Sequence, residues 1–184
     1  IEIGSSAFSG CEKLSGISLP DSVKEIGLSA FQDCSRLRDF SFPDGVESIQ
    51  YGCFSGCKNL EKIRIPNSIR EFGSSAFKGC AKLRSFLIPD GVISIGSECF
   101  KDSRSLEEII IPDSVIDIGN SIFDNCSNLK SVTLPARLKN FAEQLFTGNC
   151  HPETINYKES STFILVDNLL LSKDGKTLIK YQKS

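Results

Sequence analysis

The chain repeats itself every 23 residues, and this internal repeat restricts its possible folds more than any other feature. Six of its seven prolines are separated by this interval, and several apolar columns keep the same period. Because independent columns share one period, coincidence does not explain it, whereas a solenoid of stacked copies does. The phenylalanine column contains Phe8, Phe31, Phe54, Phe77, Phe100, Phe123 and Phe146.

Two further columns indicate which side chains face the interior. Stacked copies place each residue on its counterpart in the next copy, so we expect these columns to form a continuous apolar core. The cysteine column contains Cys11, Cys34, Cys57, Cys80 and Cys126, with Ser103 in place of one cysteine. The leucine column contains Leu14, Leu37, Leu60, Leu83, Leu106 and Leu129.

Each copy contains a short alternating segment followed by proline, as in Ile63-Arg64-Ile65-Pro66. Alternation with a period of two is typical of a strand with one buried face. The proline ends the strand because it has no N–H group for a ladder hydrogen bond. Turn-forming residues follow, and then a second short extended segment such as Val23-x-x-Ile26. We therefore expect two short strands in each coil.

The rest of each copy is expected to turn the chain back on itself. A repeated glycine is predicted to make a sharp corner with positive φ, and the following Ser-Ala-Phe-x-x-Cys segment to form one helical or 3₁₀ turn capped by its serine. The glycines are Gly27, Gly73, Gly96 and Gly119. The serines are Ser6, Ser29, Ser75 and Ser121.

A single coil is too short to bury its own apolar side chains, so the coils must stack. At about 4.8 Å per strand, six or seven coils give a rod about 30 Å long. A period of 23 residues is too short for two-helix repeats and falls in the range of leucine-rich repeats. A proline in every copy also argues against helical repeats.

The consensus C-x-x-L-x-x-I-x-I-P-x-S-V-x-x-I-G-x-x-A-F resembles the repeat of the BspA-like leucine-rich-repeat family, also called the Treponema pallidum type. The segments 63–69 and 109–115 carry the resemblance most closely, and it extends over about residues 1–158. It implies a β-rich solenoid: a right-handed array of 23-residue coils built from short strands and 3₁₀ or helical turns. We expect about seven coils over 1–158, truncated at the N-terminal end.

The register decays after Phe146, where Asn149 occupies the cysteine column and Cys150 comes one place late. The segment 159–184 is predicted to be a β-hairpin that flanks or caps the array, with one strand over 163–171 and another over 177–181. Asp174-Gly175 is a strong signal for the hairpin turn. Such a hairpin would cover the open edge of the last coil.

The cysteine column has two interpretations. The favoured one is a row of small buried side chains, since a free thiol packs as a small hydrophobe. The alternative is a set of disulfides or a metal ladder, but the C-x-x-C pairs typical of zinc sites are absent from the sequence. Cys53 and Cys99 fall in the alanine column and are expected to pack there. We predict no metal or other cofactor.

Catalytic chemistry is poorly supported by the sequence. The chain has one histidine, His151, and its neighbour Cys150 would point away from it on an extended chain. Asn125-Cys126-Ser127 matches a glycosylation pattern, but Cys126 belongs to the buried column. A net charge of −2 argues against nucleic-acid binding by bulk electrostatics, and no apolar run is long enough for a membrane span. We therefore expect no enzyme activity.

The outward positions of the first strand offer the best candidate for a binding site. Leu87 and Ile110 occupy the same outward position in neighbouring coils and should touch on the sheet surface. Ile93 and Ile116 form a second outward pair in the same coils, and Lys62 and Arg64 lie beside them. Either this patch binds a protein partner, or its residues reflect only strand propensity.

A broad, rigid array with variable outward positions is suited to binding a protein partner. The resemblance implies a cell-surface or secreted adhesin-like protein that engages host or matrix proteins. An intracellular scaffold or regulatory protein of the same fold is the alternative, because unpaired cysteines are compatible with a reducing compartment.

Overall fold

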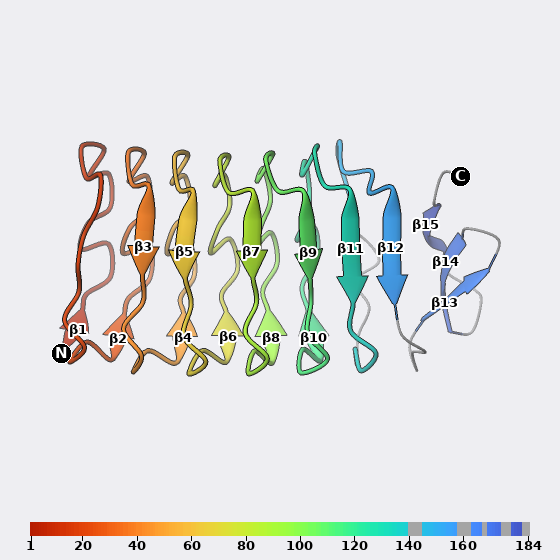
Figure 1. Cartoon of the computed structure of the whole chain (residues 1–184), viewed down its shortest axis with the longest axis horizontal. Helices are drawn as coiled ribbons and strands as arrows, with labels where there is room; N and C mark the ends of the chain where they lie inside the picture. The colour runs from red at the N-terminus through yellow and green to blue at the C-terminus, as the bar shows by residue number, and fades with distance from the viewer. Residues whose placement is uncertain (140–144, 158–162, 167–168, 174–177, 182–184) are drawn as a thin grey trace.

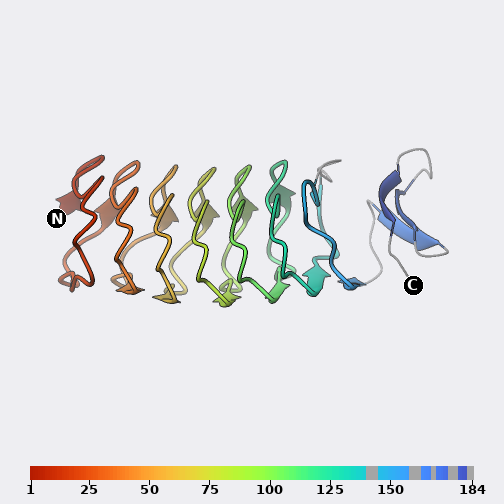
Figure 2. The same cartoon turned by 90° about the horizontal axis from the view of Figure 1, so that it is seen from above.

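The computed structural model confirms the parallel β-solenoid with coils of 23 residues (Figure 1). It describes residues 1–139, 145–157, 163–166, 169–173 and 178–181. Successive coils stack in one file along the long axis of the molecule, as Figure 2 shows. The strand pairings of the array are parallel and join residues one period apart, for example Phe86 with Ile109.

The coils contribute short strands to a front row and a back row, and the first coil contributes only its back strand. Each back strand is two residues long and is followed directly by a glycine, or by Gln50 in one coil. The front strands are β3 (Asp39–Ser41), β5 (Lys62–Arg64), β7 (Ser85–Leu87), β9 (Glu108–Ile110), β11 (Ser131–Leu134) and β12 (Thr154–Tyr157). The back strands are β1 (Glu2–Ile3), β2 (Glu25–Ile26), β4 (Ser48–Ile49), β6 (Glu71–Phe72), β8 (Ser94–Ile95) and β10 (Asp117–Ile118).

The phenylalanine column forms a continuous stack of aromatic rings between the two rows of strands. Neighbouring ring centroids along the column lie 5.1–6.0 Å apart, and their planes are inclined by no more than 16°. Phe40 and Phe86 from the front strands meet this stack edge-on, which is a favourable geometry for aromatic pairs. Inside the array the column is fully buried, whereas Phe8 in the first coil is only half-buried.

The corners differ from the sequence-based expectation. Gly27, Gly73, Gly96 and Gly119 do not have positive φ. These glycines instead allow neighbouring coils to lie close together, since a Cβ on Gly96 would collide with the backbone nitrogen of Ser74 in the preceding coil. The predicted capping serines Ser6, Ser29, Ser75 and Ser121 themselves have φ of 52–58°. Left-handed backbone therefore falls two residues later than we expected.

The left-handed residues form two columns of their own. One begins at Ser6 and includes Glu98; the other begins at Gly10 and immediately precedes the cysteine column. Small or locally hydrogen-bonding residues fit these positions because a left-handed backbone disfavours larger side chains. The second column contains Gly10, Asp33, Gly56, Gly79, Asp102, Asn125 and Gly148.

The predicted helical or 3₁₀ turns are present as isolated single turns, each closed by a hydrogen bond from an N–H to the carbonyl three residues earlier, which is the 3₁₀ pattern. The N–H of Ala30 donates to the carbonyl of Gly27, and the N–H of Cys34 donates to the carbonyl of Phe31. Two left-handed residues in each coil prevent these turns from joining into a helix, because a right-handed helix cannot contain them. No helix is present in the described residues, and hence none that is apolar and long enough to cross a bilayer.

The C-terminal segment forms a separate antiparallel sheet of three strands: β13 (Phe163–Val166), β14 (Leu169–Ser172) and β15 (Leu178–Tyr181). Strands β14 and β15 form the predicted hairpin, although its turn at Asp174-Gly175 lies outside the described residues. The single strand predicted over 163–171 is instead two strands, β13 and β14, which pair with each other. The proposed boundary at residue 158 also lies outside the described residues.

Candidate binding surface

The cysteine column is a row of buried thiols that bond to the backbone. Cys57 Sγ donates to the carbonyl oxygen of Phe31 at 3.1 Å, and Cys80 makes the same bond to Phe54 at 3.3 Å. Ser103 replaces a cysteine in this column and donates to the carbonyl of Phe77 at 3.2 Å. The column therefore needs a small side chain with a donor, which explains why cysteine and serine are interchangeable there.

Burial makes these thiols poor nucleophiles. It raises the pKa of Cys34 to about 11 and that of Cys53 to about 12, because the apolar interior disfavours the thiolate. It also raises the pKa of Cys80, where neighbouring thiols in the column act in the same direction. All eight cysteines are free thiols, and Cys11 in the first coil is exposed.

The catalytic and metal-binding alternatives gain no support from the geometry. Cys150 is fully buried whereas His151 is exposed. Asn125 already donates to Asp102 Oδ1 at 3.2 Å and accepts from the N–H of Asn149 at 3.2 Å. Within the described residues, no group of three His, Cys, Asp or Glu side chains is arranged to hold a metal ion.

The front strands carry the most prominent apolar pair on the surface. Leu87 and Ile110 are directly opposite each other in the pairing of β7 with β9, and they are 84% and 56% exposed. The residue between the outward positions, Phe86 or Ile109, points inward and is buried. The structure thus brings together the two residues that the period placed side by side.

Lys62 and Arg64 lie on β5, one coil before Leu87, and both are exposed. Arg64 is held in place, because its guanidinium contacts Asp44 Oδ1 at 2.8 Å and donates to the carbonyl of Phe42 at 3.2 Å. A shallow depression of about 470 Å³ lies over β3 and β5. Lys62, Arg64 and Asp39 line it, so this end of the front face is charged.

Ile93 and Ile116 are neighbours, since the N–H of Ile116 donates to the carbonyl of Ile93 at 2.9 Å. They directly precede the back strands β8 and β10, so they do not share the outward face of β7 and β9. Ile93 is exposed and Ile116 is only half-buried. The six predicted patch residues therefore divide between two surfaces.

Sequence reasoning missed a third apolar pair, Leu28 and Tyr51. Both are exposed, and they lie one period apart, two residues after the ends of β2 and β4. The N–H of Ser29 donates to the carbonyl of Tyr51, which places the two coils in register here. Reading the column one place beyond the repeated glycine would have found this pair, because the other coils have a polar residue there: Ser5, Ser74, Ser97, Asn120 and Glu143.

An ion-pair chain links three successive coils along the turns. Glu98 contacts Lys78 at 2.7 Å and Lys101 at 3.5 Å, and Lys101 contacts Asp124 at 2.8 Å. The hydrogen bond from Lys78 lowers the pKa of Glu98, and the hydrogen bond from Lys101 lowers the pKa of Asp124. The chain neutralises its own charge and contributes to the stacking of coils.

The model of the BspA type leucine rich repeat region matches in six copies, over residues 1–106 and 93–169. These matches cover most of the chain. The chain belongs to the BspA-type leucine-rich-repeat family. Arrays of this type are generally non-enzymatic scaffolds, which agrees with an interior filled by stacked apolar columns.

Two solved structures place the BspA-type array among known folds. The leucine-rich-repeat protein of Treponema pallidum is 29% identical, with a TM-score of 0.68 over 85% of this chain and 62% of that one. The pneumococcal vaccine antigen PcpA is 22% identical, with a TM-score of 0.54 over 98% of this chain and 42% of that one. The chain thus spans less than two thirds of either protein. A search of curated proteins gave no significant match.

Proposed function

We propose that this BspA-type array is a non-enzymatic protein-binding module of a cell-surface or secreted protein that engages host or matrix proteins. The observation that carries the proposal is the in-register pair Leu87 and Ile110, exposed at the centre of the front strands. Aliphatic side chains at two directly opposed outward positions give a patch that loses water favourably when a partner covers it.

The surroundings of this pair support a protein partner. Lys62 and Arg64 lie on one side of the patch and Glu108 is on β9 beneath Ile110, so an apolar centre is bordered by charges of both signs. This is the usual anatomy of a protein interface, with an apolar centre and a polar rim. The rigid strand ladder holds the side chains in place, which lowers the entropic cost of binding.

The proposed cell-surface location of this protein is supported only by its similarity to other proteins. PcpA is described as a pneumococcal vaccine antigen, a description consistent with a protein that is accessible at the cell surface. An intracellular scaffold is the second candidate, and the eight free thiols favour it because oxidising compartments promote disulfides. Protease accessibility of the intact cell separates the two, since only a surface protein is cleaved while the membrane is closed.

The test is a double substitution of the apolar pair, Leu87→Asp with Ile110→Asp. We expect it to weaken binding to an immobilised extracellular-matrix extract by roughly tenfold or more, because two charges would then be placed in the centre of the interface. Both side chains point outward, so the folded array and its thermal midpoint should change little.

The matched control is Ser18→Asp with Ser41→Asp, which adds the same charge in two coils where this outward position is serine. The control should bind as the unmodified chain does. Equal binding by all three proteins would remove the Leu87 and Ile110 patch from consideration.

A further inference from the structure

A row of six charged residues crosses the front of the array, and its sign alternates without exception. Each member directly precedes a front strand, so neighbouring members are one coil apart. We call these residues the charge row. They are Arg38, Glu61, Arg84, Glu107, Lys130 and Glu153.

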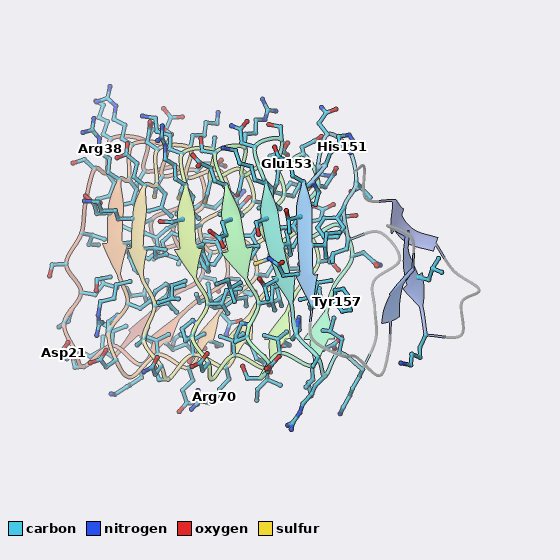
Figure 3. All side chains as sticks on the ribbon, turned by 45° about the vertical axis from the view of Figure 1, so that its right-hand side comes forward. Asp21, Arg38, Arg70, His151, Glu153 and Tyr157 are labelled. Atoms are coloured by element: carbon cyan, nitrogen blue, oxygen red, sulfur yellow. The ribbon has the colours of Figure 1, made fainter. Side chains whose placement is uncertain are left out.

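All six side chains of the charge row are exposed. Figure 3 labels its two ends, Arg38 and Glu153, along the same edge of the front strands. Among the described residues, no ion pair within 4.0 Å involves Arg38, Arg84, Glu107 or Lys130. The contact of Glu61 is with Lys82 at 3.7 Å, outside the row. The alternation therefore does not serve ion pairs among Arg38, Glu61, Arg84, Glu107 and Lys130. Arg38, Arg84, Glu107 and Lys130 remain available to another molecule.

The charge row has six members of alternating sign, so the same row read in the opposite direction has the opposite charge at every position. A second copy can lie with its front strands against those of the first and with its coils in the opposite order. The two copies are then related by a two-fold axis parallel to the strands. Arg84 then faces Glu107 of the second copy, and Arg38 faces Glu153. Glu61 faces Lys130 in the same way. All six positions meet an opposite charge, as an isologous interface requires.

The same axis places the apolar pair at the centre of the interface. It passes between β7 and β9, so Leu87 faces Ile110 of the second copy and Ile110 faces Leu87. The remaining outward residues of the front strands also meet without like charges. Asp39 faces Thr154, Lys62 faces Ser131 and Arg64 faces Thr133. The charge row and the apolar pair are separate features, and both favour the same arrangement of the two copies.

Shifting the second copy by one coil destroys this match. Arg38 would then face Lys130, Glu61 would face Glu107, and Arg84 would face itself across the axis. Because like charges at every position are unfavourable, the charge row fixes the register as well as the direction.

We propose that the array self-associates as an antiparallel two-fold dimer through its front strands, with Leu87 and Ile110 on the axis and the charge row at the rim. This proposal rests on the proposed function, in which the surface of the front strands binds proteins. A second copy of the chain would occupy this surface, and any other partner would have to displace it. Because exposed ion pairs are individually weak and are screened by salt, the dimer is expected to be weak and salt-sensitive.

The test is sedimentation of the purified 184-residue chain over a range of concentrations, at about 50 mM and about 500 mM salt. We expect a dimer whose dissociation constant rises with salt. Arg84→Glu places a glutamate opposite Glu107 twice in each dimer and should raise the dissociation constant by about tenfold or more.

The double variant Arg84→Glu with Glu107→Arg separates pairing between copies from pairing within one chain. It restores opposite charges across the two-fold axis, so the dissociation constant should return to within about threefold of the original. Within the chain, however, it places like charges next to each other, at positions 61 and 84 and at positions 107 and 130.

Failure to recover the dimer in the double variant would overturn the proposal, and so would a monomer at every concentration tested. Neither result affects the proposed function, which is measured separately by binding of the Leu87→Asp, Ile110→Asp variant to matrix extract.

Discussion

The first coil and the middle coils carry the same residue types in the same columns, yet their side chains are buried to very different extents. Phe8 is half-buried and Cys11 is exposed, whereas Phe77 and Cys80 are completely buried. The middle coils have a neighbour on both sides, and in the described structure the first coil is covered on one side only. Burial in this protein is therefore supplied by neighbouring coils, as expected for a nearest-neighbour array.

The glycine column shows the same difference. A Cβ on Gly4 in the first coil would meet nothing within 4 Å, whereas a Cβ on Gly96 would lie 2.4 Å from the backbone of Ser74. Identical residues thus face different constraints, because the atom that restricts Gly96 belongs to the preceding coil. We expect the effects of substitution to decrease from the phenylalanine stack to the ion-pair chain.

The phenylalanine stack should give the largest difference. Phe77→Ala is expected to lower the free energy of unfolding by about 3–5 kcal/mol, because it opens a cavity between two stacked rings. Phe8→Ala removes a half-buried ring that stacks only on Phe31, and should cost about 1–2 kcal/mol. Denaturant unfolding followed by circular dichroism measures both. A loss below about 1 kcal/mol for Phe77→Ala would show that the column does not form the core.

The glycine column should give the next largest difference. Gly96→Ala is expected to cost about 1–3 kcal/mol, since the added methyl group forces two coils apart. Gln50 occupies the same column, so the backbone can adapt and we do not expect complete unfolding. Gly4→Ala is the matched control and should change stability by less than about 0.5 kcal/mol. Equal thermal midpoints for the two variants would contradict the close approach of coils.

The buried thiols should make stability depend on alkaline pH. The folded pKa of Cys34 is about 11 and that of Cys53 about 12, both above the ordinary value of 9.0. A raised folded pKa gives stability that is complete below pH 9 and is lost as the pH rises toward these folded values. Thermal midpoints should therefore be constant from pH 7 to about 9 and fall above it.

Alkylation of the native chain near neutral pH provides the internal comparison for the thiols. Cys11 should react quickly because it is exposed, and Cys80 should react only after unfolding. Rapid labelling of Cys80 in the native state would be inconsistent with a buried column.

The ion-pair chain should give the smallest effect. Lys101→Met removes contacts to Glu98 and Asp124 and is expected to cost about 0.5–1 kcal/mol, because both carboxylates are partly shielded from water. The low pKa of Asp124 gives stability that is present above its ordinary value of 3.8 and is lost as the pH falls through the folded value. The benefit of Lys101 should therefore disappear in acid.

The exposed pair of Arg64 with Asp44 provides the control for the ion-pair chain. Arg64→Met should leave the thermal midpoint nearly unchanged, because an exposed ion pair contributes little. A larger loss for Arg64→Met than for Lys101→Met would reverse our ranking of the two sites.

The period made much of the array predictable. It identified the strand that contains Leu87, the inward position of Phe86 and the buried row that contains Cys80, since stacking follows from repetition alone. The corners were less predictable. A glycine at position 96 is compatible with a positive φ and also with close contact between coils. The sequence does not distinguish the two, because it does not give the distance between neighbouring coils.

The coil length, the pattern of two strands per coil and the columns that fill the interior follow from the order of residues, because local periodicity and stacking depend on that order alone. The three-dimensional structure was needed to show that Ile93 lies on a different surface from Leu87 and that the thiol of Cys80 donates to a carbonyl. Both facts depend on how one coil lies against the next in space, which is a relation between residues distant in the chain.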